Sequence, residues 1–267
     1  MTHHVVELRD GRQVGVTGLG DPDARRLVLF CHATPGAGGF DPDPIATAEA
    51  GIRMITLDRP GYGSTAADGL EAGPSEASDD AGAPLSIWLT MVDDYLQLVE
   101  QVASSIADTE FGKIGVVGWG VGAVYATGLA ARHPELVERL ALIEPTAPTR
   151  ARLKAAESDE QLDARVENLD ALDPYLGASD RLGFMLESAG HGEHGMQLDH
   201  RALSDPHWTE WLSSVTARTL LLSSDDSDGE WYRHRIRGAR AFGSWSNPST
   251  TIVEAWPTVL RFLTAER

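Results

Sequence analysis

The chain has 267 residues, an apolar fraction of 42% and a net charge of −18, from 40 acidic and 22 basic residues. That length is enough to bury a core in one large domain or two small ones. The negative charge argues against nucleic acid or an anionic membrane as partner, because both require a positive field. The single cysteine, Cys31, excludes an internal disulfide framework and fits a reducing compartment.

Alternating and apolar segments define the expected elements. His4–Leu8 and Gln13–Thr17 alternate on either side of Asp10-Gly11, which predicts a β-hairpin. Buried strands are expected at Arg26–Cys31, Arg53–Leu57, Arg139–Ile143 and Thr219–Leu222, and a strand, a glycine turn and a helix follow one another within Lys113–Ala131. Further helices are expected at Leu85–Ile106, near Glu230–Arg235 and at about Pro257–Thr264. No apolar run approaches the roughly 20 residues that span a bilayer, and no leader pattern precedes the hairpin, so a cytoplasmic protein is expected.

Short apolar strands that alternate with helices predict an α/β fold with a mostly parallel sheet covered on both faces. Residues 65–84 contain almost no large apolar side chain and are expected to form a surface excursion. Residues 146–215 lose the strand rhythm between two sheet strands, which predicts a helical cap over the carboxyl ends of the strands. The expected division is a core from 1–145 and 216–267, with the cap inserted at 146–215.

The centre of the chain is a strand, a tight glycine turn and an alanine-rich helix. The turn reads Gly118-Trp119-Gly120-Val121-Gly122. This is the local pattern of a nucleophile elbow, in which a serine normally occupies the central position and flanking glycines let strand and helix approach. Here Gly120 stands at the centre and has no side chain. Glycine adopts the positive φ of such a turn with little penalty, so this change relieves strain.

Several motifs in this order resemble the α/β-hydrolase superfamily. They are His32-Ala33-Thr34-Pro35-Gly36 after the first buried strand, Asp58-Arg59-Pro60-Gly61-Tyr62-Gly63-Ser64 after the second, the elbow itself, and Asp225-Asp226 after the late strand. Phe40-Asp41-Pro42-Asp43-Pro44 further resembles bacterial, actinobacterial-looking members. The resemblance covers nearly the whole chain.

This resemblance implies a set of site residues. The oxyanion amides would belong to Thr34 and Val121, and the acid of a Ser-His-Asp triad would be Asp226, with Asp225 and Asp228 as rivals. The family's late histidine should lie in Gly243–Glu254, which contains none, and Ser249 occupies its place if Val253–Trp256 sets the register. Nucleophile and base are therefore both missing, and Gly120, Asp226 and Ser249 are vestigial positions.

The remaining candidates receive structural interpretations. His32 is expected to organise the oxyanion loop rather than to catalyse, and Cys31 to be a small buried core residue. Trp119 is a candidate pocket residue beside the elbow. His191-Gly192-Glu193-His194 does not have the spacing of a familiar metal site, so neither metal nor cofactor is expected.

Besides a partner-binding subunit, which an exposed apolar patch on the cap would signal, two functions remain open. The first is a non-hydrolytic pseudoenzyme, a protein that binds a small apolar or ester- or lactone-like molecule, or one that templates a cyclase- or lyase-like reaction. The alternative is a residual, triad-independent hydrolase in which Asp226 or His32 activates water on a small ester or lactone. A homodimer is compatible with either function, and the sequence does not fix the oligomeric state.

Overall fold

A computed structural model describes residues 1–67, 70, 86–105, 112–148, 180, 183, 193–224, 226–243, 245 and 250–266. The strands are β1 (Thr2–Glu7), β2 (Gln13–Gly20), β3 (Arg26–Cys31), β4 (Ile52–Leu57), β5 (Ile114–Trp119), β6 (Val137–Ile143), β7 (Arg218–Leu222) and β8 (Arg240–Ala241). The helices are α1 (Pro44–Glu49), α2 (Ile87–Ser105), α3 (Gly122–Arg132), α6 (Glu193–Ser204), the 3-10 helix η2 (Pro206–Ser214), α7 (Asp226–Arg233), α8 (Thr251–Glu254) and α9 (Trp256–Thr264).

The strands form one sheet in the order β1-β2-β4-β3-β5-β6-β7-β8. β2 is antiparallel to both of its neighbours, and every pair from β4 to β8 is parallel. The predicted hairpin is confirmed, with Val6 opposite Val14. Each strand of the parallel part is linked to the next through a helix or a long connection, as parallel pairing requires.

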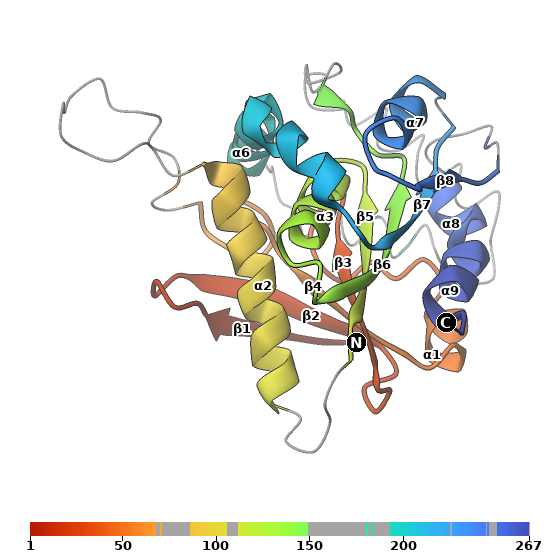
Figure 1. The fold of residues 1–267 in the computed structure, drawn as a ribbon. Coiled ribbons are helices and arrows are strands. Elements are labelled where there is room, and N and C mark those ends of the chain that lie inside the picture. Colours follow the sequence, from red (N-terminus) through yellow and green to blue (C-terminus); the bar gives the residue numbers. More distant parts are fainter. Residues whose placement is uncertain are drawn as a thin grey trace, which may run out of the picture.

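Both faces of the sheet are buried, and alternate strand residues face opposite layers. Figure 1 shows α2 and α3 together on one side, and α1, α8 and α9 together on the other. On the first side, Leu29 and Cys31 of β3 pack in the same cluster as Trp88 of α2. On the second, Val28 and Phe30 pack in the same cluster as Trp256 of α9. This period of two on an apolar strand is the pattern expected of a sheet between two helical layers.

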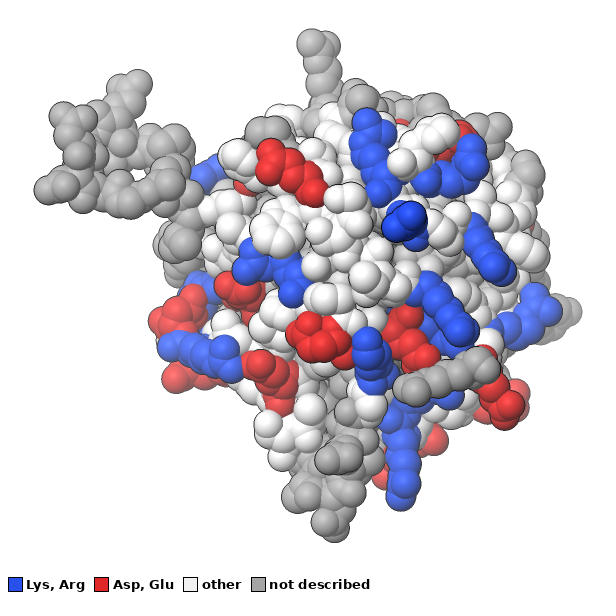
Figure 2. Space-filling view, in the orientation of Figure 1, with Lys and Arg blue, Asp and Glu red and all other residues white. Residues whose placement is uncertain are grey.

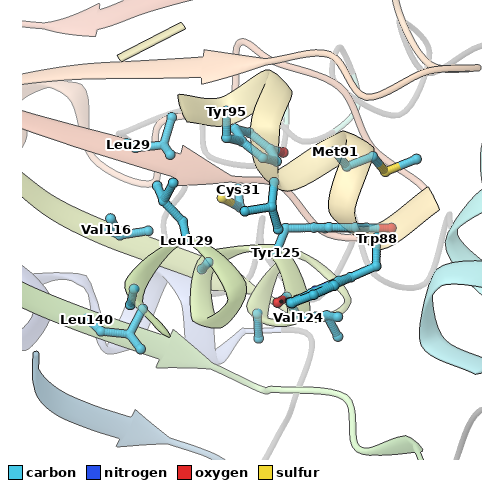
Figure 3. Close-up of a cluster of buried hydrophobic side chains, with 14 of the residues drawn as sticks. Leu29, Cys31, Trp88, Met91, Tyr95, Val116, Val124, Tyr125, Leu129 and Leu140 are labelled. Atoms are coloured by element: carbon cyan, nitrogen blue, oxygen red, sulfur yellow. Dashed lines mark hydrogen bonds between the residues drawn. The ribbon is translucent and has the colours of Figure 1, made fainter. Parts of the chain in front are cut away.

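The cluster under α2 and α3 is the larger of these two cores. Figure 3 shows Trp88, Met91 and Tyr95 of α2 and Tyr125 of α3 gathered around Cys31. Cys31 is fully buried, as predicted, and burial raises the pKa of its thiol to about 12. The thiol is therefore protonated at neutral pH and has a packing role.

The predicted surface excursion at 65–84 lies largely outside the described residues, as does most of the predicted cap at 146–215. Within the cap region, α6 and η2 are described, and they contact α2 and α3 respectively. The boundaries of the cap therefore stay a prediction. Three short elements, α1, β8 and α8, were not predicted. Among the described helices, none is long and apolar enough to cross a membrane.

Candidate functional site

The elbow has the predicted strand-turn-helix geometry. β5 ends at Trp119, α3 begins at Gly122, and Gly120 between them has a φ of +58°. The flanking glycines are required sterically, because a Cβ on Gly118 would lie 2.5 Å from the Cα of Ala123, and one on Gly122 would lie 2.1 Å from the carbonyl oxygen of Cys31. The chain therefore keeps the close approach of strand and helix that an elbow needs.

The central position differs from its flanks because it has room. Among the described residues, a Cβ on Gly120 would come within 4 Å of Ala33 alone, at a close 3.3 Å from its Cβ, and Gly120 itself is partly exposed. A residue other than glycine would fit there, but it would have to adopt the left-handed conformation, at a cost of roughly 1–2 kcal/mol. Gly120 thus keeps the elbow turn at the carboxyl end of β5 without a side chain.

The two backbone amides that the resemblance assigned to an oxyanion site are those of Thr34 and Val121, and this assignment stays a prediction. Val121 is the N-cap of α3, and Thr34 lies in the loop that follows β3 and is joined to Pro35 by a cis peptide bond. Within the described part of the chain, neither the Thr34 nor the Val121 N–H donates a hydrogen bond. Free amides at the start of a helix favour an oxygen that carries negative charge.

A buried ion pair lies behind the Thr34 loop. The Arg59 guanidinium donates from Nε and Nη2 to the two carboxylate oxygens of Asp199, at 3.1 and 2.8 Å, and both side chains are 0% exposed. Arg59 also donates to the backbone carbonyls of His32 and Ala33, at 2.6 and 3.2 Å. Arg59 therefore binds the backbone of the loop that follows β3, and Asp199 of α6 fixes the position of the Arg59 guanidinium.

Asp199 receives three further hydrogen bonds from hydroxyl groups. Tyr62 donates at 2.9 Å, Tyr125 donates at 2.6 Å, and the Thr34 hydroxyl donates to the same carboxylate. The rings of Tyr62 and Tyr125 also lie 5.3 and 5.1 Å from the guanidinium carbon of Arg59. Charge-assisted bonds of this kind are about twice as strong as neutral ones. The network joins α6, α3, the loop after β3 and the turn after β4 into one unit.

The charges of the pair stabilise each other. Burial alone would raise the pKa of Asp199, but the Arg59 charge and the hydrogen bonds from Arg59, Thr34 and Tyr125 lower it. Burial alone would lower the pKa of Arg59, but Asp199 keeps it well above its usual value. Both groups are therefore ionised at neutral pH. The sequence motif contained Arg59, whereas Asp199 lies in no motif and its partnership was not predicted.

His32 is enclosed by the loop that follows β3 and by the turn that follows β4. Its ring is fully buried, Nδ1 lies 2.8 Å from the Ala33 carbonyl oxygen, and the Arg59 amide donates to Nε2 at 3.4 Å. A carbonyl only accepts, so Nδ1 carries the proton. Burial first, and then the Arg59 charge, lowers the pKa of His32 well below 6.5. The ring is neutral and both nitrogens are occupied, so it has no lone pair available to activate water.

A carboxylate that was not predicted as a site residue lies beside the elbow. Glu144, which follows β6, is the one non-glycine residue with positive φ in the described ranges, at +45°. Two backbone hydrogen bonds join this segment to Gly120. The Gly120 amide donates to the Ile143 carbonyl at 2.9 Å, and the Thr146 amide donates to the Gly120 carbonyl at 3.3 Å. Strained residues of this kind concentrate at functional sites.

Donors from two other segments hold the Glu144 carboxylate. It accepts from the amide and hydroxyl of Ser224, at 2.8 and 2.9 Å, and from the Thr251 hydroxyl at 2.7 Å. The available signal in the sequence was an acidic residue at the end of a buried strand, Glu144-Pro145. The ends of β6 and β7 and the start of α8 are thereby joined next to Gly120.

The remaining predicted positions are distributed as follows. Asp225 and Ser249 lie outside the described residues. Asp226 is the first residue of α7, and its side chain is also outside them. Asp228 is 8% exposed. The choice among the three aspartates, and the match of Ser249 to the histidine position, therefore stay predictions.

Trp119 lies deeper than a pocket residue would. Its side chain is 2% exposed and packs against Phe40, with 5.4 Å between ring centroids. Among the described histidines, cysteines and carboxylates, no group of three could hold a metal ion. The described candidate site thus consists of the Gly120 turn, the backbone amides of Thr34 and Val121, and the carboxylate of Glu144.

The sequence and the fold were compared with known proteins. Residues 28–264 match the sequence model of the family described as "Alpha/beta hydrolase family". No curated protein matches the chain significantly. Many solved structures share the fold.

Three of these structures illustrate the likeness. An enol-lactonase from Burkholderia xenovorans LB400 is 16% identical, with a TM-score of 0.67 over 98% of this chain and 100% of its own. An alpha/beta hydrolase fold protein from Nakamurella multipartita is 18% identical, with a TM-score of 0.68 over 99% of both chains. An esterase from Exiguobacterium antarcticum is 17% identical, with a TM-score of 0.64 over 97% of this chain and 100% of its own. The family match spans most of the chain and agrees with the strand order and the elbow, and the protein therefore belongs to the alpha/beta hydrolase family.

Proposed function

We propose that this protein binds a small carbonyl- or carboxylate-containing molecule at the elbow without covalent chemistry. The observation that carries the proposal is Gly120, which keeps the elbow conformation but offers no atom that could attack a substrate. The free amides of Thr34 and Val121 are suited to an oxygen of the ligand. Structural neighbours named as an enol-lactonase and an esterase support ester- and lactone-like ligands.

Binding is tested with two probes, butyrate and γ-butyrolactone, by saturation-transfer NMR on the full chain. We expect saturable transfer with the wild type and its loss in Gly120→Leu, whose side chain would occupy the position proposed for the ligand. The matched control is Gly51→Leu, because Gly51 has a φ of +64° and nothing within 4 Å of its Cβ position. The Gly51→Leu substitution imposes similar backbone strain far from the elbow, and this variant should bind both probes as the wild type does. Equal transfer in all three proteins would contradict the proposal.

A second function is favoured by Glu144, whose carboxylate could activate water beside Gly120 in a triad-independent hydrolase. His32 does not serve this role, because both of its ring nitrogens are engaged. Such a route would lack both nucleophile and imidazole base, and positioned general-base catalysis contributes only about 10²–10⁴-fold. Hydrolysis would therefore be slow compared with an intact triad.

Ester hydrolysis separates the two functions. With short-chain nitrophenyl esters, we expect no turnover by the wild type above buffer, and a gain of about a hundredfold or more in Gly120→Ser/Ser249→His, which restores nucleophile and base. Gly120→Ser alone should remain nearly inactive. If the wild type hydrolyses the ester and Glu144→Gln or Asp226→Asn abolishes that activity, the non-hydrolytic proposal is wrong and the carboxylate-based hydrolase replaces it.

A further inference from the structure

A second cavity lies at the opposite end of the sheet, where the parallel strands begin. Its volume is about 610 Å³. Four cations and two carboxylates reach its wall: Arg25, Arg26, Lys113, Arg139, Glu138 and Glu266. The wall therefore carries a net charge of +2 in a chain whose net charge is −18. We call this space the basal cavity.

The cations of the basal cavity are held in place by neutral groups. Arg26 donates to the Leu263 carbonyl at 3.0 Å, Arg139 to the Ala265 carbonyl at 2.8 Å, and Lys113 to the Pro134 carbonyl at 2.8 Å. Within the ranges that the structure describes, none of these cations, nor Arg25, forms a salt bridge. Carbonyl dipoles orient these side chains without neutralising their charges.

Arg139 at the cavity wall is nearly buried, with 4% exposure. Burial lowers the pKa of Arg139; Glu138 acts in the opposite direction, and the charges of Arg218 and Arg26 lower it further. Buried charges in native proteins are normally paired, because a charge that is removed from water is unfavourable without a partner. Arg139 has two cations and one carboxylate among the charges that act on it, so an anion that enters the cavity stabilises its charge.

Basic side chains also predominate around this region on the surface. Figure 2 shows Lys and Arg side chains outnumbering Asp and Glu on the side of the molecule where Figure 1 places the C-terminus. Such a local positive field raises the concentration of anions near the cavity despite the overall negative charge.

We propose that the basal cavity binds a small, multiply charged oxyanion of the phosphate class, such as a diphosphate group. Arginine forks and a lysine are the usual donors to phosphate oxygens, and the net charge of the wall matches a dianion. The volume leaves room for an organic group attached to the phosphate. Because Lys113 precedes β5 and Gly120 follows it, this site lies at the other end of the strand and does not depend on the proposed function.

The probe is inorganic pyrophosphate, titrated calorimetrically into the full chain at constant ionic strength. We expect one saturable site in the wild type and a rise in Kd of about tenfold or more in Arg25→Gln/Lys113→Gln. Both replaced residues are exposed, so folding should be preserved and is checked by circular dichroism. The charge-matched control is Arg237→Gln/Arg240→Gln, which removes two exposed arginines outside the cavity wall and should keep the wild-type Kd.

Three results would overturn the inference. The first is the absence of saturable binding to the wild type. The second is an equal loss of affinity in the two double variants, which would show attraction to the general field of the surface. The third is unchanged affinity in Arg25→Gln/Lys113→Gln, which would place the anion elsewhere.

Discussion

Replacing Asp199 with alanine is expected to lower the free energy of unfolding by about 3–5 kcal/mol, because it leaves the Arg59 charge buried without its partner. Asp199 and Arg59 are both 0% exposed, so the guanidinium has no contact with bulk solvent in the folded protein. The hydroxyls of Tyr62 and Tyr125 lose their acceptor at the same time. Urea denaturation of the two proteins at neutral pH measures the difference.

Asp94→Ala provides the matched control. Asp94 is also almost buried and accepts two hydrogen bonds from an arginine, at 3.0 and 2.6 Å, but that partner, Arg12, has a side chain that is 20% exposed. Arg12 can turn toward water when Asp94 is removed, so the loss should be smaller. A loss in Asp199→Ala that does not exceed that of Asp94→Ala would show that the Arg59 pair does not support the fold in this way.

Stability is expected to fall as the pH drops below about 6.5, and His32 is the group responsible. The folded state keeps His32 neutral, because burial and the Arg59 charge lower its pKa well below 6.5. Below pH 6.5 the unfolded chain protonates His32, and it therefore binds more protons than the folded state. The free energy of unfolding therefore decreases by about 1.4 kcal/mol per pH unit, from 6.5 down to the pKa of the folded protein.

This slope is measured by urea denaturation at several pH values between 4.5 and 7.5. His32→Asn keeps a short amide donor near the Ala33 carbonyl and should flatten the dependence, whatever its stability at neutral pH. His200→Asn replaces an exposed histidine of α6 and should leave the slope unchanged. If the His32→Asn protein keeps the wild-type slope, another group controls the acid sensitivity.

The fold was predictable because its signals are local. The Asp10-Gly11 turn fixed the hairpin, five apolar runs gave the parallel strands, and the three glycines of the elbow marked the join of β5 to α3. The short elements α1 and α8 were missed because they have six and four residues, too few to show a helical period. β8, with two residues, carries no strand pattern at all.

The site was predictable only in part. Gly120, Thr34 and Val121 belong to motifs and could be placed from the sequence. Asp199 could not, because its role comes from a partner 140 positions away, and a single acidic residue on a polar helix is ordinarily solvated. Glu144 was missed for a different reason: its positive φ is a property of the backbone that no side-chain pattern reports.

The hydrogen bonds on Asp199 also bear on how the molecule moves. They attach α6 to the Thr34 loop, to the turn after β4 and to α3 at once, so this helix cannot lift by itself in the manner of a hinged lid. Any opening large enough to separate α6 from α3 would break all of these bonds together and would resemble partial unfolding more than a gating motion.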